Sequence, residues 1–399
     1  IIDYIRTPIA KFQGGLSEVR ADDLAAIVLK EIVKRNPQIP AEEIEDVILG
    51  CANQAGEDNR NVARMASLLA ELPIKIGGET VNRLCASGMA AISNAYRAIA
   101  IGEGDFYIAG GVEQMTRAPY VLSKSAQPFG RDVELFDSSF GWRFVNPKMK
   151  ELYGVDGMGE TAENLAEIYK ISREAQDEFA LLSQQKATSA QNSGRLAQEI
   201  VNVEIPQKKG EPKIFSQDEF VKPDTTLDKL AKLRPAFKKE GGSVTAGNSS
   251  GLNDGAAAMI LASEDAVKKY NLKPLAKIIS SAVVGVEPRI MGIGPVEATK
   301  KALSRANLSL EDMDIIELNE AFAAQALSVL QELGIDAKDE RLNPNGGAIA
   351  LGHPLGMSGT RIVGTAALEL QKKNKKYALC TLCIGVGQGY AMIIENVNL

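Results

Sequence analysis

The chain has 399 residues, of which 45% are hydrophobic and 24% charged, a globular composition that excludes a disordered or fibrous protein. Its net charge of −6 argues against nucleic-acid binding, and the absence of any apolar run of 18 residues argues against a membrane span. Four cysteines are too few for a disulfide scaffold and indicate a reducing, cytoplasmic setting. A single histidine excludes any site that needs two.

The predicted elements repeat along the chain. A helix at 23–30, an acidic turn at 40–43 and an apolar strand at 44–49 are echoed by similar segments between 298 and 317. A helix that opens at Ser87 leads to a strand at 106–109, and another that opens at Ser358 leads to a strand at 377–380. Apart from chance similarity of short amphipathic segments, this order predicts two similar α/β halves with mainly parallel sheets.

Between these halves, the composition changes over residues 117–245. Seven of the 16 prolines, the only Trp and two helical patterns near 160–198 lie in this stretch. Within it, residues 206–240 carry nine basic and six acidic side chains, a local charge of +3. We expect an inserted lobe, whose basic part either meets an anionic ligand or is a solvated surface.

Two residues stand out as candidates for covalent chemistry. Cys85 lies between a predicted short strand and a helix rich in Ala, where the helix dipole favours a thiolate, although a buried core cysteine is the alternative. His353 lies in a glycine-rich loop, residues 343–359, whose backbone a ligand could approach closely. It is also the only histidine available to activate a thiol.

Two other segments allow simpler interpretations. Cys380 and Cys383 form a CxxC pair, but residues three apart in a strand point to opposite faces, which argues against a metal or redox site. The glycines after Cys383 do not match a dinucleotide-binding fingerprint. At Asn319 a strand ends and a helix is predicted to begin, so a helix cap is the simplest role for this residue.

Taken together, these segments resemble the signatures of the thiolase family along essentially the whole chain. The matching segments are 82–88, 319–322 (Asn-Glu-Ala-Phe), 343–359 and the run from Cys383. The resemblance implies a five-layer αβαβα fold from two duplicated halves with an inserted loop domain. It places the N-terminal half at 1–116 and 246–270, a CoA-binding loop domain at 117–245, and the C-terminal half at 271–399.

The resemblance also implies an acyltransferase acting on acyl-CoA and CoA. Cys85 would be the acylated nucleophile, His353 its proton acceptor and Cys383 the second acid/base. Asn319 would hold a water that forms one oxyanion hole with His353, and the N–H groups of Cys85 and Gly385 would form the other. CoA would be a co-substrate, with no permanent cofactor and no metal, and the assembly a homodimer or homotetramer.

Residue-by-residue matching implies CoA contacts from Met158, Lys222, Phe237, Ala246 and Ser250. This part of the match is uneven. Many short-chain thiolases carry an Arg where this chain has Lys222, and a His where it has Gly157. The CoA contacts are therefore matched less closely than the four central residues.

Three segments, 51–61, 141–147 and 383–389, look most like the β-ketoadipyl-CoA thiolase subfamily, which cleaves 3-oxoadipyl-CoA to succinyl-CoA and acetyl-CoA. Val386 breaks the usual glycine run after Cys383. The alternatives are an acetoacetyl-CoA thiolase (acetyl-CoA C-acetyltransferase), a general fatty-acid 3-ketoacyl-CoA thiolase and a non-catalytic CoA- or lipid-binding protein. A dicarboxylate substrate would need a partner for its carboxylate, and Arg143 and Lys148 are candidates.

Overall fold

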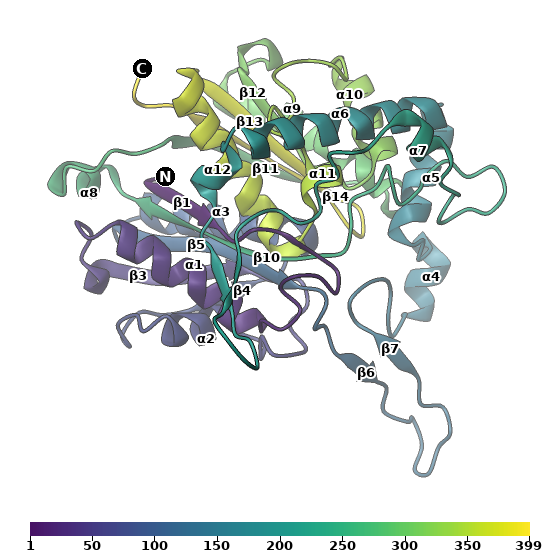
Figure 1. Cartoon of the computed structure of the whole chain (residues 1–399), viewed down its shortest axis with the longest axis horizontal. Helices are drawn as coiled ribbons and strands as arrows, with labels where there is room; N and C mark the ends of the chain where they lie inside the picture. The colour runs from purple at the N-terminus through teal and green to yellow at the C-terminus, as the bar shows by residue number, and fades with distance from the viewer.

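Two mixed β-sheets form the centre of the computed structural model, which describes residues 1–399 (Figure 1). The first sheet has the order β1 (Asp3–Arg6), β10 (Asn253–Ala262), β5 (Phe106–Gln114), β3 (Ile44–Gly50), β4 (Glu79–Val81), with β2 (Ala10–Lys11) beside β10. The second has the order β11 (Lys277–Gly285), β14 (Gln388–Glu395), β13 (Tyr377–Ile384), β12 (Ile315–Leu318).

The two sheets share one pattern of strand pairing. β1–β10 and β10–β5 are antiparallel and β5–β3 is parallel; β11–β14 and β14–β13 are likewise antiparallel and β13–β12 is parallel. This agreement confirms the two duplicated halves. The expectation of mainly parallel sheets is wrong, because β14 follows β13 through a turn at 385–387 that is too short for a parallel crossover.

Helices complete the five layers. α3 (Ser87–Ala100) and α12 (Leu355–Lys373) lie between the sheets and contact each other. α3 packs on the first sheet, and α12 contacts both sheets. α1 (Ala21–Arg35) and α2 (Val62–Leu69) cover the first half, and α9 (Gly294–Ala306) and α10 (Ala323–Leu333) cover the second. α3 and α12 approach each other closely at Gly88, where a Cβ would lie 2.7 Å from the carbonyl oxygen of Gly356. None of the helices has the length and hydropathy of a membrane span.

The hydrophobic core follows these layers. Its largest cluster, 37 buried residues, lies between the sheets and includes side chains of α3, α12, β5 and β13. Separate clusters lie under α1 on the outer face of the first sheet and under α9 and α10 on the outer face of the second. Burial on both sides explains why β5 and β13 read as continuous apolar runs.

The chain between β5 and β10 forms the inserted lobe. Its elements are β6 (Tyr120–Leu122), β7 (Leu135–Asp137), α4 (Pro147–Tyr153), α5 (Met158–Ile168), α6 (Arg173–Asn192), β8 (Val203–Ile205), β9 (Lys213–Phe215) and α7 (Leu227–Ala231). The β6–β7 hairpin projects from the body (Figure 1), whereas α6 packs on α10 and α11 (Ala348–Leu351). A short helix, α8 (Glu264–Lys269), follows β10. The boundaries of the three predicted parts stay a prediction.

A buried ionic network ties the lobe to both halves. Arg6, at the end of β1, contacts Glu199 and Asp218 of the lobe at 2.7 Å each. Arg195 contacts Glu199 at 3.1 Å and Glu369 of α12 at 2.9 Å. Since all these side chains are at most 4% exposed, removing one partner would leave an uncompensated buried charge. The network therefore fixes how the lobe sits over the site.

Candidate active site

A cavity of about 860 Å³ opens between the inserted lobe and the ends of α3, α12 and β13. Of its 32 lining residues, 19 are hydrophobic, so polar groups inside it act in a poorly solvated setting. Nine of the ten predicted site residues line it: Cys85, Met158, Lys222, Phe237, Ala246, Ser250, His353, Cys383 and Gly385. The tenth, Asn319, lies behind His353.

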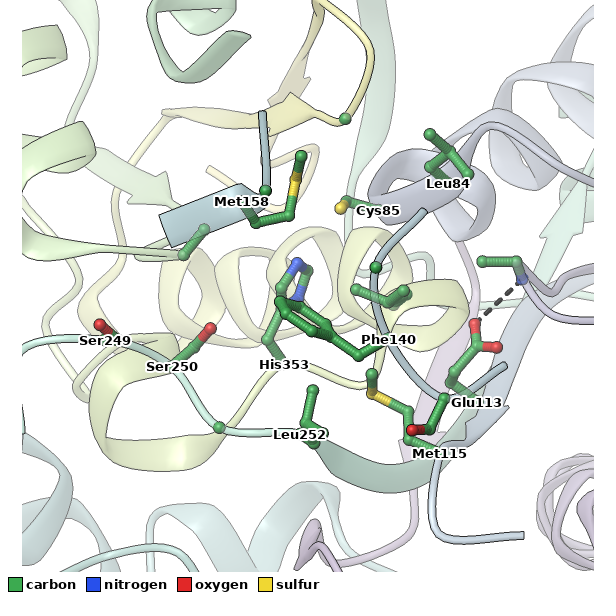
Figure 2. A pocket seen from close by; sticks show the side chains of 18 of the residues that line it. Leu84, Cys85, Glu113, Met115, Phe140, Met158, Ser249, Ser250, Leu252 and His353 are labelled. Atoms are coloured by element: carbon green, nitrogen blue, oxygen red, sulfur yellow. Dashed lines mark hydrogen bonds between the residues drawn. The ribbon is translucent and has the colours of Figure 1, made fainter. Parts of the chain in front are cut away.

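The turn before α3 presents Cys85 to the cavity. Leu84 has a left-handed backbone, φ 46°, and a short 3-10 turn over 84–86 leads into the helix. The hydroxyl of Ser87 holds this turn, accepting from the Arg83 N–H at 2.9 Å and donating to the Leu84 carbonyl at 2.6 Å. The Cys85 sulfur points into the cavity (Figure 2).

Burial dominates the acidity of Cys85. It raises the pKa of the thiol to about 11, against the opposing effect of hydrogen bonds from the N–H groups of Gly385 and of Cys85 itself. The stabilisation of a thiolate expected from the helix dipole is therefore outweighed in this structure. At neutral pH the thiol stays protonated and requires a base before it can attack.

His353 is positioned by the turn that precedes α12. Gly352 has φ 105°, and a Cβ there would lie 2.6 Å from Cγ of Asn253, so only glycine fits. The backbone N–H of His353 donates to Oδ1 of the same Asn253 at 2.9 Å. This arrangement fixes the ring between Met158 and Leu252 in the cavity (Figure 2).

The imidazole of His353 contacts two buried side chains. Its Nδ1 lies 2.6 Å from Oγ of Ser358, and its Nε2 lies 3.4 Å from Nδ2 of Asn319. Burial, with a smaller effect of the Arg361 charge, lowers the pKa of His353 to about 3. The ring is therefore neutral at neutral pH and can accept a proton.

Asn319 is not a helix cap, and that prediction is wrong. β12 ends at Leu318, but α10 begins only at Ala323. The intervening residues pair with a neighbouring segment: the Ser250 N–H donates to the Ala321 carbonyl and the Ala323 N–H to the Asn248 carbonyl. Oδ1 of Asn319 is buried without a partner among the protein atoms.

The two cysteines of the CxxC pair face opposite ways, as predicted. Cys383 lines the cavity, and burial raises the pKa of its thiol, with a further rise from the nearby Cys85. Cys380 lies in the core between the sheets, where its thiol donates to the Ile362 carbonyl at 3.6 Å. No group of three or more His, Cys, Asp or Glu side chains in the structure has an arrangement that could hold a metal ion.

The turn after Cys383 carries the two residues, Val386 and Gln388, at which the sequence departs from the family pattern. Val386 has φ 64°, unusual for a β-branched residue, and its side chain lines the cavity. Oε1 of Gln388 accepts a hydrogen bond from Nη1 of Arg83 at 3.1 Å. Sequence reasoning missed Arg83, whose only signal was its place two residues before Cys85.

Glu113, at the end of β5, is a second residue that sequence reasoning missed. Its carboxylate accepts N–H groups from Ala52, Asn53 and Gly356 at 3.0, 2.9 and 2.8 Å, and thus joins the loop after β3 to the first turn of α12 beside the cavity. Figure 2 shows Glu113 in this place. Burial raises its pKa to about 7 against these hydrogen bonds. An acidic residue in a fully buried strand was the available signal.

The residues predicted to bind CoA gather on the opposite wall. Nζ of Lys222 lies 4.9 Å from the centroid of the Phe220 ring, and Phe237 packs edge-on against Phe322 with centroids 6.0 Å apart. Ser250 lies on the far side of His353 from Glu113 (Figure 2). This wall combines one cation, aromatic faces and a hydroxyl.

Of the two candidates for binding a carboxylate, only Arg143 lines the cavity. Lys148 is exposed on α4 and is not among the lining residues. The structure thus separates two cations that the sequence could not rank.

Comparison with known proteins places these features in a family. The family model "Thiolase, N-terminal domain" matches residues 1–265, and "Thiolase, C-terminal domain" matches residues 272–396. The chain is 60% identical over 397 residues to "3-oxoadipyl-CoA/3-oxo-5,6-dehydrosuberyl-CoA thiolase" of Escherichia coli (strain K12), covering 100% of this chain and 99% of that protein.

Two further similarities agree with this placement. "Beta-ketoadipyl-CoA thiolase" of Acinetobacter baylyi is 58% identical to the chain, with 100% and 99% of the two sequences covered. The crystal structure of the Bacillus anthracis acetyl-CoA acetyltransferase superposes with a TM-score of 0.92 at 42% identity, covering 100% of this chain and 98% of that one.

Proposed function

The chain belongs to the thiolase family, and on this premise we propose that it cleaves 3-oxoadipyl-CoA with CoA to succinyl-CoA and acetyl-CoA. The observation that carries this proposal is the convergence of Cys85, His353 and Cys383, from three distant parts of the chain, on one largely apolar cavity. The substrate is supported by the names of the two relatives at 58–60% identity. The enzyme is then an acyltransferase.

The first half-reaction forms an acyl-cysteine. The Cys85 sulfur attacks the C3 carbonyl of the substrate while Nε2 of His353 takes the thiol proton. With a thiol pKa near 11 and an imidazole pKa near 3, the separated ion pair is disfavoured, so proton transfer accompanies attack. The C2–C3 bond then breaks, and its electron pair takes a proton from the Cys383 thiol at C2 to give acetyl-CoA.

The second half-reaction returns every group to its starting state. The thiol of an incoming CoA gives its proton to the Cys383 thiolate, and the CoA sulfur attacks the succinyl group on Cys85. Cys85 leaves as a thiolate and takes back the proton held by His353. Both halves of the reaction therefore use the same two acid/base groups in opposite directions.

Negative charge that develops on the thioester and ketone oxygens requires hydrogen-bond donors. The N–H groups of Cys85 and Gly385 both bond to the Cys85 sulfur and so point toward the reacting centre. The buried, unpaired Oδ1 of Asn319 agrees with the role of holding a water beside His353. These two sets of donors are assigned to the two oxyanions.

CoA is a co-substrate in this proposal and approaches along the wall of Met158, Lys222, Phe237, Ala246 and Ser250. The ammonium of Lys222 suits a phosphate as a point charge. The basic segment around it supplies long-range attraction for an anionic ligand. The aromatic faces suit the flat and apolar parts of CoA.

Initial rates of thiolysis test the substrate. Purified enzyme is assayed with 3-oxoadipyl-CoA, acetoacetyl-CoA and a longer 3-oxoacyl-CoA under the same free CoA concentration. We expect the highest kcat/KM for 3-oxoadipyl-CoA and no cleavage by Cys85→Ala. Preference for acetoacetyl-CoA or the longer chain would replace the substrate with that of another thiolase, and CoA binding without any cleavage would favour a non-catalytic binding protein.

We also propose a homodimer or homotetramer in the cytoplasm. Exposed apolar side chains on the projecting β6–β7 hairpin, among them Leu122, Phe129 and Leu135, support association with another copy. Four free, buried cysteines support a reducing compartment. Light scattering after size exclusion measures the oligomer, and a monomer would overturn this part of the proposal.

A further inference from the structure

Two cations line the cavity, and they lie on opposite sides of the catalytic residues. Lys222 covers Phe220, which packs against Gly251 beside Ser250. Nη1 of Arg143 instead lies 3.5 Å from the carbonyl oxygen of Ser138.

That carbonyl marks the wall on which Arg143 lies. It also accepts from Nδ2 of Asn53 at 3.0 Å, and the Asn53 N–H donates to Glu113 at 2.9 Å. Glu113 and Ser250 lie on opposite sides of His353 (Figure 2). Arg143 therefore belongs to the wall across the cavity from Ser250 and the neighbouring pair of Phe220 and Lys222.

Arg143 has hydrogen-bonding capacity that the protein does not use. The contact of 3.5 Å to Ser138 is its only hydrogen bond, and no carboxylate lies within 4.0 Å of its guanidinium. Two neighbouring polar groups are engaged with others, Asn53 Nδ2 with Ser138 and the Ser138 hydroxyl with the Pro119 carbonyl, whereas Oδ1 of Asn53 is buried without a partner. The guanidinium is the free cation on this wall.

The segment that carries Arg143 is anchored on both sides of it. The indole N–H of Trp142 donates to the Asp156 carbonyl at 3.2 Å. The ring of Phe144 packs edge-on against Phe136 with centroids 5.1 Å apart, and its φ of 50° turns the chain there. Arg143 is thus held at a defined place rather than on a free loop.

The reaction fixes which part of the substrate reaches this wall. After C2–C3 cleavage the shortened acyl group stays on Cys85, whereas acetyl-CoA, whose CoA part lies along the Lys222 wall, departs. The acyl chain must therefore extend from Cys85 away from CoA. We infer that Arg143 is a specificity-determining residue that binds the terminal carboxylate of a dicarboxylic acyl chain, an inference that rests on the proposed function.

A guanidinium suits this role because its forked donors match a carboxylate, and the apolar lining strengthens the pairing. A neutral chain of equal length gains nothing from Arg143 and leaves its charge without a partner. The residue therefore selects for the dicarboxylate and against its neutral counterpart.

The test compares wild type, Arg143→Gln and Arg143→Lys on 3-oxoadipyl-CoA and on 3-oxohexanoyl-CoA, a neutral substrate of equal chain length. We expect Arg143→Gln to lower kcat/KM for 3-oxoadipyl-CoA by roughly 10- to 100-fold, mainly through KM. Activity on 3-oxohexanoyl-CoA stays within about twofold or rises, which also shows that the variant is folded. Arg143→Lys recovers part of the loss, because charge remains without the fork.

Lys148→Ala is the matched control, since it removes an exposed cation of the same segment that lies outside the cavity; we expect the wild-type ratio of the two kcat/KM values. Equal losses on both substrates, or an unchanged ratio in Arg143→Gln, would overturn the role of Arg143 and leave the proposed function intact. A wild-type enzyme that cleaves neutral substrates but disfavours 3-oxoadipyl-CoA would overturn both.

Discussion

Nδ1 of His353 lies 2.6 Å from Oγ of Ser358, a residue in the first turn of α12. The Ser358 hydroxyl donates its one proton to the Pro354 carbonyl at 2.8 Å. Nδ1 must then be the donor to Oγ, which leaves Nε2 unprotonated, with its lone pair facing Nδ2 of Asn319 at 3.4 Å. Ser358 therefore selects the tautomer that can take a proton from Cys85.

Replacing Ser358 by Ala should lower kcat about 5- to 10-fold with little change in KM, because the ring loses the hydrogen bond that orients it. Steady-state thiolysis measures this split. Ser67→Ala is a matched control: Ser67 is also buried and donates to the carbonyl four residues earlier, but it lies in α2. Equal losses of kcat in both variants would show that Ser358 contributes packing alone.

The two acid/base steps should separate in half-reactions. Cys383→Ala should still exchange labelled CoA into acetyl-CoA through Cys85, because that exchange breaks no C–C bond. It should lose C–C cleavage on the order of 100- to 10,000-fold, the usual contribution of a positioned acid/base group. Cys85→Ala should lose both reactions.

Cys380→Ala provides the control for this pair. Its thiol faces the core between the sheets, so the variant should retain turnover and lose about 1–2 kcal/mol of stability from the cavity left behind. Thermal unfolding and thiolysis measure the two effects. If Cys380→Ala and Cys383→Ala lost C–C cleavage equally, the separation of the two cysteines by strand alternation would be wrong.

Much of the fold was predictable because the two halves share the same local order of helix, turn and apolar strand. The echo between 23–49 and 298–317 predicted two like halves, and the sheets confirm it. The parallel or antiparallel pairing of the strands was not predictable from that echo. β10, which begins at Asn253 after the inserted lobe, pairs with β5 in the first sheet, and local periodicity does not show which distant strands become neighbours in a sheet.

The site was predictable where the proposed role belongs to the side chain itself. Cys85, His353 and Cys383 are rare residue types in this chain, and they lie in the turn before α3, in a glycine-rich loop and at the end of β13. Glu113 escaped prediction because its role depends on three N–H groups from two segments that lie far apart in the chain. The sequence singled out Val386 but did not predict its φ of 64°, because a β-branched residue rarely adopts this backbone conformation.

Glu113 should make stability depend on pH in a defined direction. Its pKa rises from the usual 4.5 to about 7 in the folded state, so the folded protein binds more protons than the unfolded chain between these values. The free energy of unfolding should therefore fall as pH rises from about 4.5 to 7, by about 3 kcal/mol from this group.

Thermal unfolding of wild type and Glu113→Gln between pH 4.5 and 8 isolates this effect. The glutamine side chain has one acceptor oxygen fewer at every pH, which shifts the Tm of the variant by a constant amount. The Tm of wild type relative to Glu113→Gln should decrease as pH rises. An increase would mean that the three N–H groups outweigh burial and that the carboxylate is stabilised in its charged form.

Lys222→Ala should raise KM for CoA about tenfold and leave kcat nearly unchanged, because the ammonium contributes binding rather than chemistry. The difference from wild type should shrink at high ionic strength, since Lys222 is exposed. Lys222→Arg should bind CoA at least as well, because a forked guanidinium can hold a phosphate through two hydrogen bonds.

Lys232→Ala is the control: it removes an exposed cation of the same lobe that lies outside the cavity, and the variant should match wild type. Equal effects of Lys222→Ala and Lys232→Ala would reduce the role of Lys222 to the general basic charge of residues 206–240.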